Sequence, residues 1–348
     1  MTDGRQLRVV QWATGNIGRR SLRQVIEHPD LELVGLYVYA DAKAGCDAGE
    51  LCGVGEVGVT ATQDVDEIVG LGADCVLYMG DRVDVDVLCR LLASGANVVT
   101  TRGEFHRPAS MDPDVRARVE AACREGATSI HSTGSSPGFI TEALPLVLLS
   151  LQRRFEGLVI DEFADVSSRN SPELLFDVMG FGKDPAAFDQ RRWAHGTASF
   201  GPSLSAVGDA IGLPIDSVDS TGEVAVARHD VAIAAGTVPA GTVAAQRMVV
   251  TGRRGGEPLL TFRANWYCAT DVEPAWDLRG TGWRVVVDGD TPLDVSIGFP
   301  VEPERYADTT PNFTANRPVN AIRYVVAAEP GIRTTAELPQ VIPTLGAR

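Results

Sequence analysis

The stretch RVVQWATGNIGRR, residues 8–20, constrains the fold of this chain more than any other part of the sequence. Alternating apolar residues lead into a glycine-containing turn, and the amphipathic run SLRQVIEH follows it. This order predicts a strand, a tight turn and a helix, which is the context in which a G-x-G-x-x-G pattern binds a phosphate. The residues of the turn are Ala13, Thr14, Gly15, Asn16, Ile17 and Gly18.

Two of the three glycines of that pattern are present. Gly15 lets the backbone approach a pyrophosphate closely, and Gly18 lets the new helix pack tightly on the strand. The first position is Ala13, which the turn tolerates if its φ angle stays negative. The free N–H groups of the first helical turn favour an anion by ~0.3–1 kcal/mol beyond the hydrogen bonds themselves. The pattern predicts a dinucleotide site; the alternative is a glycine-containing turn without a ligand.

Length and charge limit the classes of function. A chain of 348 residues indicates about two domains of ~100–200 residues each. The formal net charge of −15 argues against a nucleic-acid backbone or an anionic membrane as a partner, so local features must hold any anionic cofactor. No apolar run approaches the ~20 residues of a membrane span, and the N-terminal MTDGRQLR has no signal-peptide core.

Cysteine and histidine usage indicates a cytosolic protein without a metal site. The six cysteines are scattered without a C-x-x-C pair, as expected of small buried apolar residues in a reducing compartment. The five histidines show no metal-ligand spacing with cysteines or carboxylates. We therefore expect a cytoplasmic protein that binds no metal.

Strand and helix patterns alternate from the first turn to residue 134. Asp64 and Asp112 stand at positions typical of helix N-caps, and Pro113 follows as a first helical residue. Residues 45–62, GCDAGELCGVGEVGVTAT, are predicted to be a glycine-rich connection that leads to a short strand. The alternation predicts an α/β fold with a Rossmann-type doubly wound parallel sheet over residues 1–134.

The pattern changes from Pro137 onward. Residues 135–311 mix helical stretches with long alternating strands, which predicts a second α+β domain with a mainly antiparallel sheet. One face of such a sheet needs cover, so we expect a homodimer through this domain. Helices are predicted at 139–154, 173–179, 185–193 and 203–211, strands at 157–166, 222–235, 242–252, 258–269, 283–289 and 293–299, hairpin turns at 253–258 and 288–292, and a last helix from 312 to Pro330-Gly331.

The end of the second strand bears on the choice of coenzyme. A Rossmann fold that prefers NAD usually places an acidic residue there to hold the ribose 2′-hydroxyl. Here the strand ends at Tyr39, beside the expected cofactor, and Asp41 comes late. Three cations lie where they can reach a 2′-phosphate, although each taken singly is better explained as a solvated surface residue: Arg19, Arg20 and Lys43. The sequence therefore favours NADP, with NAD as the alternative.

Several motifs resemble a known superfamily. DAGELCG (47–53) and the ending N-x-x-V-N-A-I (316–322) with Ala-Glu-Pro-Gly resemble dihydrodipicolinate reductases. VVQWATGNIG and STGSSPGF (132–139) are more similar to a sister group, the 2,4-diaminopentanoate dehydrogenases and native amine dehydrogenases. The resemblance covers the two ends of the chain well and the middle only in outline. It implies that the segment 312–348 returns to complete the first domain.

One departure from the reductases argues against their substrate. That family carries a His-His-x-x-x-Lys stretch and a later Ser-Gly-Thr, which bind a ring diacid. The corresponding region here, DEFADVSSRNSPELL (161–175), has neither His nor Lys. A site built for that diacid would lack its cationic clamp, so we reject this specific activity.

Glu104 is the residue that the resemblance implies for catalysis. It follows a predicted strand, at the edge where ligands bind in open α/β folds. In the amine dehydrogenase group, a Glu after this strand faces the substrate beside the nicotinamide. One carboxylate can move the protons of reductive amination and stabilise a cationic iminium, and partial burial would raise its pKa towards the working range. The alternative is an exposed loop acid.

The resemblance implies further contacts with the cofactor and the substrate. The cofactor is expected to lie near Met79 and Gly80, to bond with Thr100 and Thr101, and to have its carboxamide held by Ser135, Ser136 and Pro137. Candidates for the substrate wall, each of which is also compatible with an ordinary core, are Phe139, Asn170, Phe176, Met179 and Trp266.

Together, these features imply an NAD(P)-dependent amine dehydrogenase. It would interconvert an aldehyde or ketone plus ammonia with a primary amine by hydride transfer. No clear cationic clamp for a carboxylate is present, which favours a small apolar amine, although Arg169 is available as a clamp. The alternatives are a non-catalytic NADP(H) sensor and a reductase of the dihydrodipicolinate reductase type that acts on another C=N or C=O substrate.

Overall fold

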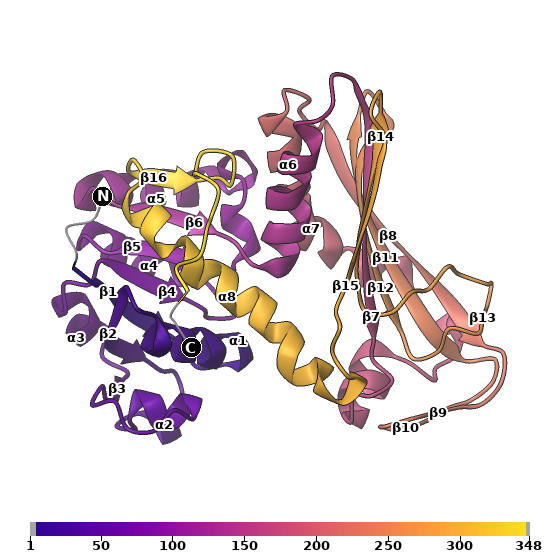
Figure 1. The fold of residues 1–348 in the computed structure, drawn as a ribbon, viewed down its shortest axis with the longest axis horizontal. Coiled ribbons are helices and arrows are strands. Elements are labelled where there is room, and N and C mark those ends of the chain that lie inside the picture. Colours follow the sequence, from indigo (N-terminus) through magenta and orange to yellow (C-terminus); the bar gives the residue numbers. More distant parts are fainter. Residues whose placement is uncertain (1–4, 346–348) are drawn as a thin grey trace. The chain divides into compact units, whose positions relative to one another are not determined.

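The chain divides into two compact units. The computed structural model describes residues 5–345, so the first four and last three residues of the chain lie outside the described range. Unit 1 combines Met1–Phe139 with Thr310–Arg348, and unit 2 is Ile140–Thr309 (Figure 1). The boundaries expected from the sequence are 134/135 and 311/312. The nucleotide-binding and substrate-binding roles assigned to the two parts stay predictions.

Unit 1 is built on a seven-stranded sheet whose strands all run parallel. The order is β16-β6-β5-β4-β1-β2-β3, and it reverses direction along the sequence between β1 and β4. The predicted doubly wound sheet is therefore confirmed. The strands are β1 (Leu7–Trp12), β2 (Leu31–Tyr37), β3 (Ala61–Thr62), β4 (Cys75–Tyr78), β5 (Asn97–Thr100), β6 (Ser129–Ser132) and β16 (Gly331–Arg333).

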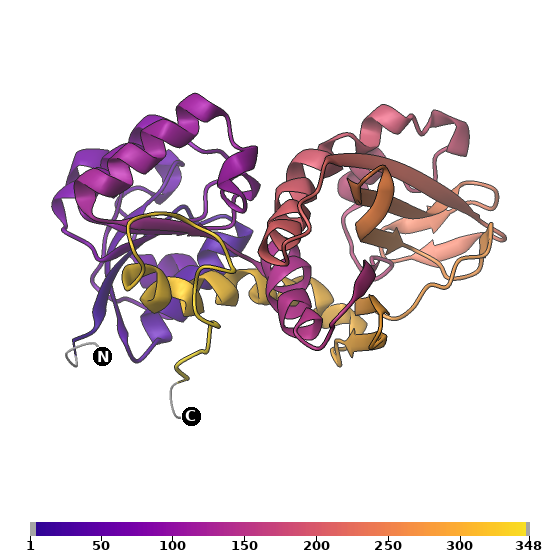
Figure 2. The ribbon, with the colours of Figure 1, turned by 90° about the horizontal axis from the view of Figure 1, so that it is seen from above.

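Helices cover both faces of this sheet. Alternate residues of each strand point to opposite faces, so Val10 and Val98 pack against α3, α4 and α5, whereas Val9 and Val99 pack against α1 and α8. Figure 2 shows the sheet between α5 and the C-terminal part of α8. The helices are α1 (Asn16–Glu27), α2 (Ala48–Cys52), α3 (Val65–Gly70), α4 (Val85–Ala93), α5 (Pro113–Gly126) and α8 (Tyr306–Val326).

Aspartate caps explain where several of these helices begin. The carboxylate of Asp64 accepts from the amides of Asp66 and Glu67, and Asp112 caps α5 in the same way, as predicted. The prediction of residues 45–62 as a plain connection was wrong in part, because α2 lies within it. Asp47 caps α2 and also accepts hydrogen bonds from Val57 N and Gly58 N, so one carboxylate orders the whole segment. The many glycines of this segment favour a loop, which is why the helix was not predicted.

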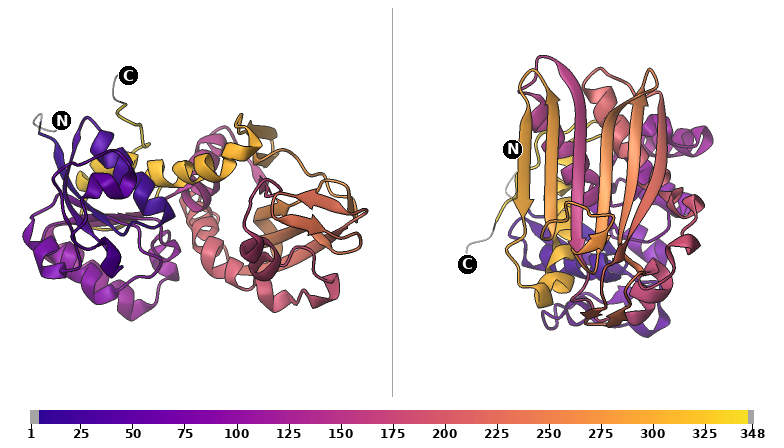
Figure 3. Two further views of the ribbon diagram at one scale, coloured as in Figure 1. Left: turned by 90° about the horizontal axis from the view of Figure 1, so that it is seen from below. Right: turned by 90° about the vertical axis from the view of Figure 1, so that its right-hand side faces the viewer.

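Unit 2 contains a second seven-stranded sheet, in the order β13-β8-β11-β12-β7-β14-β15 (Figure 3). Only the pair β12–β7 is parallel, so the predicted mainly antiparallel sheet is confirmed, as are the hairpins that join β11 to β12 and β14 to β15. The strands are β7 (Phe155–Asp165), β8 (Ser217–Ala227), β11 (Val243–Arg254), β12 (Glu257–Tyr267), β13 (Val272–Glu273), β14 (Gly282–Gly289) and β15 (Leu293–Gly298), with β9 (Val231–Ile233) and β10 (Gly236–Val238) as a separate pair.

The strand predicted at 222–235 is in fact two. β8 ends at Ala227, and the chain turns at Arg228, whose amide donates to Asp271 O and whose guanidinium pairs with Asp271 and Glu273. The next residues form β9, which pairs with β10 instead. Contacts with a distant loop therefore interrupt an alternation that looks continuous in the sequence.

Several helix boundaries also differ from those expected. The helix predicted from 139 to 154 is present as far as Leu149: residues 139–143 form a π-helical turn that continues into α6 (Leu144–Leu149). The segment 185–193 forms two short 3₁₀ turns instead of one helix. The helix expected from 203 is α7 (His195–Ala210), which contains Pro202. Its early glycines pack on the sheet: a Cβ on Gly196 would overlap the side chains of Ser220 and Met248. Helix α8 begins at Tyr306, earlier than the predicted 312, and ends at Val326, before Pro330.

Candidate active site

The turn between β1 and α1 leaves room for a ligand at the N-terminus of α1. Gly15 is the N-cap of α1, and a Cβ placed on it would meet no atom within 4 Å. A Cβ on Gly18 would instead overlap the carbonyl oxygen of Ala13. Gly18 is therefore needed for helix packing, whereas Gly15 keeps open the space in front of the first helical amides. This geometry fits the pyrophosphate of a dinucleotide.

Ala13 has a φ angle of 74°, so the expectation that this angle stays negative was wrong. Two hydrogen bonds impose the left-handed conformation. The Ala13 N–H donates to Tyr37 O on β2 at 2.9 Å, and the buried Gln11 side chain donates from Nε2 to Ala13 O at 2.9 Å. Gln11 is itself held by Ser21 of α1, whose hydroxyl donates to Gln11 Oε1. Neither polar residue was predicted from the sequence, because both lie within apolar patterns.

The three predicted cations, Lys43, Arg19 and Arg20, differ in their contacts and in their exposure to solvent. Lys43 Nζ donates to Thr14 O at 3.1 Å and lies 3.0 Å from Thr14 Oγ1, so its charge is held at the phosphate turn. Arg19 is exposed and Arg20 is half-buried on α1. Asp41, the acid that follows β2, accepts a hydrogen bond from Gln63 Nε2 at 3.0 Å.

Four aromatic side chains gather at the carboxyl ends of β1, β2 and β4. Trp12 stacks on Tyr37 with ring centroids 3.7 Å apart, and on Tyr78 at 5.5 Å. The Trp12 indole N–H donates to the hydroxyl of Tyr39, which is 53% exposed. A Cβ on Gly80 would lie 3.1 Å from that hydroxyl. Of these residues only Tyr39 and Gly80 were predicted from the sequence, although aromatic residues at the ends of three paired strands were a usable signal.

The ends of β4 and β5 are tied together by hydrogen bonds. Met79 N donates to Trp12 O at 3.0 Å, and the fully buried Thr100 donates from Oγ1 to Tyr78 O at 2.7 Å. Thr100 Oγ1 also accepts from Arg102 N at 3.2 Å. The hydroxyl of Thr100 is thus already used within the protein, and Thr101 beside it is half-buried.

Glu104 lies in a 3₁₀ turn, Gly103–Phe105, just after β5. Its side chain is 49% exposed, and Oε1 lies 2.9 Å from Arg102 Nη2. Arg102 also donates from Nη1 to Asp81 O, in the loop after β4, at 2.5 Å. The exposure differs from the partial burial expected, which remains a prediction for the state with a bound cofactor.

The loop that carries Glu104 is anchored to β6. Ser132 donates from Oγ to Arg102 O at 2.7 Å, and the buried His106 places Nε2 3.3 Å from the same hydroxyl. Neither Ser132 nor His106 was among the expected site residues. The strand ends β4, β5 and β6 therefore hold one loop cluster, which projects the Glu104 carboxylate.

The segment Ser135–Pro137 follows β6 at the same edge. Ser135 Oγ lies 2.6 Å from Thr314 Oγ1 of α8, and the Ser136–Pro137 bond is cis. Phe139, also in unit 1, carries the guanidinium of Arg317 over its ring at 5.8 Å from the centroid. The expected roles of these residues towards carboxamide and substrate stay predictions.

The other expected wall residues all lie in unit 2. Phe176, Met179 and Trp266 pack, partly buried, against a core that includes Phe163 and Phe181. Asn170 is exposed in the loop after β7. The structure thus brings three of these four residues into one cluster, where they also serve as ordinary core.

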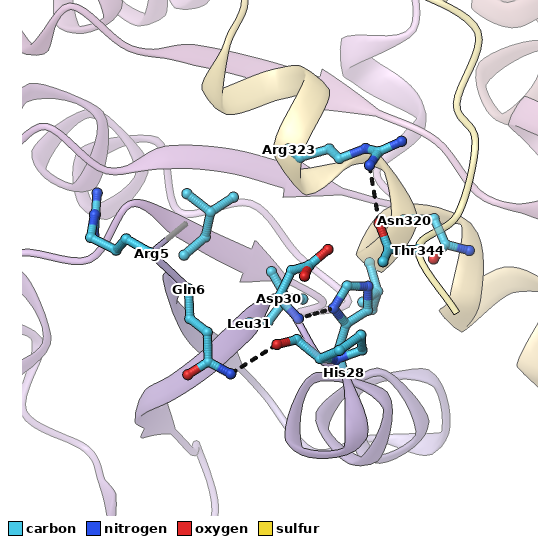
Figure 4. A pocket seen from close by; sticks show the side chains of 11 residues that line it. Arg5, Gln6, His28, Asp30, Leu31, Asn320, Arg323 and Thr344 are labelled. Atoms are coloured by element: carbon cyan, nitrogen blue, oxygen red, sulfur yellow. Dashed lines mark hydrogen bonds between the residues drawn. The ribbon is translucent and has the colours of Figure 1, made fainter. Parts of the chain in front are cut away.

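A pocket of unit 1 lies at the amino ends of β1 and β2, the edge opposite to the turn (Figure 4). It encloses about 180 Å³. The polar groups around it bond with one another: His28 Nδ1 accepts from Asp30 N, and Arg323 donates to Thr344 Oγ1. Burial lowers the pKa of His28 below its usual 6.5. These contacts fix the end of α1 and the C-terminal segment.

Two features are absent from residues 5–345. No helix in this range is long and apolar enough to cross a membrane. Within the same range, no three His, Cys, Asp or Glu side chains are grouped as metal ligands would be.

Comparison with known proteins identifies the chain's relatives. Residues 179–347 match the family profile of the 2,4-diaminopentanoate dehydrogenase C-terminal domain. An amine dehydrogenase of Streptomyces virginiae is 29% identical over 345 residues, which cover 95% of each chain. The 2,4-diaminopentanoate dehydrogenase of Acetoanaerobium sticklandii is 24% identical over 82% of this chain and 78% of its own. The structure of an amine dehydrogenase from Mycobacterium smegmatis superposes with a TM-score of 0.74 at 21% identity, over 97% of both chains.

These similarities confirm the resemblance indicated by the motifs in residues 8–20 and 132–139. They extend it through the middle of the chain, which the motifs covered only in outline. The solved structure supports the fold, a Rossmann-type sheet followed by a second mixed-sheet unit.

Proposed function

We propose that this chain is an NAD(P)-dependent amine dehydrogenase that interconverts a small aldehyde or ketone plus ammonia with a primary amine. One observation carries the proposal. A glycine turn open to a pyrophosphate and the Glu104 carboxylate lie at the same edge of one sheet. They do so in a chain that is similar over 95% of its length to an amine dehydrogenase. The class, an oxidoreductase that acts on C–N groups, follows from its relatives.

The residues of the turn hold and orient the cofactor. The amides of the first turn of α1 bind the pyrophosphate, and Lys43, held by Thr14, adds a positive charge beside it. The aromatic cluster of Trp12 and Tyr39 borders the adenosine. When bound, the nicotinamide supplies or accepts the hydride, and the protein supplies position and proton transfer.

Glu104 performs the proton transfers of the amination direction. Its carboxylate takes a proton from ammonium, which frees the nitrogen lone pair to attack the carbonyl carbon. The resulting carbinolamine loses its hydroxyl as water when Glu104 returns the proton, and the C=N⁺ bond forms. The carboxylate, again an anion, stabilises the cationic iminium until its carbon accepts a hydride. In deamination the same proton movements run in reverse.

The cations favour NADP as the coenzyme. Asp41, the acid nearest the end of β2, is engaged with Gln63, which weakens its role as a partner of the ribose 2′-hydroxyl. Arg19 is exposed on the first turn of α1 and is available to a 2′-phosphate. NADPH should therefore bind more tightly than NADH, and Arg19→Ala should reduce the difference.

Unit 2 is the proposed dimerisation unit. Helix α7 covers one face of its sheet, where Phe200 stacks on Phe262 at 4.2 Å. Residues of the other face, including Val159, Thr261 and Val286, line a shallow hollow of about 550 Å³. A second copy of this chain would bury this apolar surface. Light scattering of the purified protein tests the expected twofold mass.

Turnover of purified protein tests the proposal. Excess ammonium with a short aliphatic aldehyde should cause oxidation of NADPH or NADH. Glu104→Gln should lower kcat at least about a hundredfold, because the amide cannot carry the proton, while coenzyme binding is retained. The matched control is Glu120→Gln, which changes another Arg-paired carboxylate on α5. Full activity of the Glu104→Gln variant would refute the mechanism, and a lack of binding of either coenzyme would refute the whole proposal.

A further inference from the structure

We infer that Arg102 is a positioning residue that sets the orientation of the Glu104 carboxylate and links it to the loop after β4. This inference rests on the proposed role of Glu104. Arg102 acts through its two side-chain contacts, one on Glu104 and one on the loop that follows Met79 and Gly80.

The two contacts use different nitrogens of one rigid group. Arg102 Nη2 lies 2.9 Å from Glu104 Oε1, and Nη1 donates to Asp81 O at 2.5 Å. The guanidinium is planar, so a bond to one loop fixes the direction in which it can reach the other. The carboxylate therefore cannot change its rotamer without breaking a bond to a group that is tied down elsewhere.

The backbone of Arg102 is anchored as firmly as its side chain. Its N–H donates to Thr100 Oγ1 at 3.2 Å, and its carbonyl accepts from Ser132 Oγ at 2.7 Å. The Arg102 side chain is 30% exposed, against 49% for Glu104. The arginine is thus the less mobile partner of the pair, and the glutamate is the one that it orients.

The pair leaves one carboxylate oxygen available for chemistry. Oε1 receives the Arg102 bond, and within the described residues no hydrogen bond to Oε2 is formed. Oε2 is therefore the atom that would accept the ammonium proton. A partly exposed ion pair of this kind adds little to stability, so its value lies in orientation. A misplacement of about 1 Å can cost a factor of about a hundred in rate.

Kinetics of two Arg102 variants test this inference. Arg102→Ala should lower kcat between about tenfold and a hundredfold, with the KM for the coenzyme unchanged, because Glu104 keeps its charge but loses its orientation. Arg102→Lys should recover part of the loss, and added guanidinium should recover part of it in the Ala variant. The matched control, Arg116→Ala, breaks the Arg116–Glu120 pair on α5 and should retain wild-type kcat.

Two further results distinguish this inference from the proposed function. If Arg102→Ala turns over at the wild-type rate, the positioning role is refuted, whereas the proposed function stands. If the wild-type protein shows no turnover, the proposed function fails. Amide hydrogen exchange then tests whether Arg102 links the two loops. Arg102→Ala should speed amide exchange in both 79–84 and 102–106, and unchanged exchange there would overturn the link between the two loops.

Discussion

Ala13 occupies the position at which a phosphate-binding turn usually has glycine, and it adopts the left-handed conformation that favours glycine. Within residues 5–345 the only other non-glycine residue with positive φ is Ala127, at 52°, which ends α5. Strained residues of this kind persist when the surrounding structure determines them. At Ala13 those surroundings are the bonds to Tyr37 and Gln11, which orient the turn on which the proposed cofactor depends.

Replacing Ala13 by glycine should stabilise the fold. The change removes the steric cost of a Cβ at positive φ, and after the larger entropy cost of glycine about 1 kcal/mol remains. The melting temperature should rise by roughly 2–4 °C in calorimetry. Ala127→Gly is the matched control, since it relieves the same strain far from the turn. A lower melting temperature for Ala13→Gly would contradict the positive φ angle.

His28, at the C-terminal end of α1, should make stability depend on pH. Burial lowers its pKa below 6.5; Arg323 acts in the same direction, and Asp30 opposes both. The unfolded chain therefore binds the proton at a higher pH than the folded chain does, so stability is lost as the pH falls below about 6.5.

The variant His28→Asn tests this dependence. Its side-chain oxygen can accept the bond from Asp30 N that His28 Nδ1 accepts now. The loss of stability between about pH 8 and about pH 5, measured by urea unfolding, should be smaller in the variant than in the wild type. At about pH 8 the imidazole is neutral in both states, so that measurement isolates the effect of the substitution itself. An equal loss in both proteins would contradict the prediction.

At the scale of elements, the β1–α1 unit combines two different uses of glycine. Gly18 is needed for the contact of α1 with the carbonyl of Ala13, and Gly15 for the open space at the helix N-terminus. Both were singled out in the sequence for these reasons. What the sequence did not reveal is the polar support beneath the turn, because Gln11 and Ser21 contribute through contacts between elements rather than through any local pattern.

Alanine should therefore have a different effect at each of the two glycines: it should weaken NADPH binding at Gly15 and lower the stability of the fold at Gly18. Gly15→Ala has an ordinary φ of −66° and no neighbour within 4 Å, so the fold should keep its melting temperature. The dissociation constant of the Gly15→Ala variant for NADPH should rise at least about tenfold, because the Cβ enters the pyrophosphate space. This corresponds to a loss of about 1.4 kcal/mol in binding free energy. Gly18→Ala should instead destabilise the fold by about 1–3 kcal/mol. Calorimetry and NADPH fluorescence separate the two effects, and tight NADPH binding by Gly15→Ala would refute the assigned cofactor site.

At the scale of the whole molecule, unit 1 is made from both ends of the chain. Val319, Ile322 and Val325 of α8 pack in the same core as Val9 and Leu77, and β16 extends the sheet beside β6. The chain leaves unit 1 after Phe139 and re-enters it at Thr310, and these two points lie close together. Ser135 and Thr314 are hydrogen-bonded, and Thr310 is one helical turn, about 6 Å, before Thr314. Unit 2 is thus inserted into unit 1 at one place.

Unit 1 should fold without unit 2 when the two breaks are joined. A flexible linker of about eight residues between Phe139 and Thr310 spans about 16 Å, which exceeds the expected gap. The linker-joined unit 1 should melt cooperatively and bind NADPH, but it should have no dehydrogenase activity because it lacks unit 2. A chain of residues 1–139 alone is the control; it lacks Val319, Ile322 and Val325 and should not melt cooperatively. Failure of the joined protein to fold would contradict the independence of unit 1.

Much of this protein follows from local sequence patterns. The parallel sheet, the aspartate caps at 64 and 112, the β1–α1 turn and the two hairpins of unit 2 were all predicted, because alternation, capping and turn residues act over a few neighbouring positions. The short helix α2 was missed although its contacts are local, since Asp47 accepts hydrogen bonds from residues 49, 50, 57 and 58 of the same glycine-rich segment. Tertiary contacts decided the rest: the positive φ of Ala13, the early start of α7 and the break after β8. In each of these cases the partner atoms come from another element or from residues distant in sequence, and no local pattern contains them. The same holds for Glu104. Its position after a strand can be recognised in the sequence, but its orientation depends on Arg102 and the loop at Asp81.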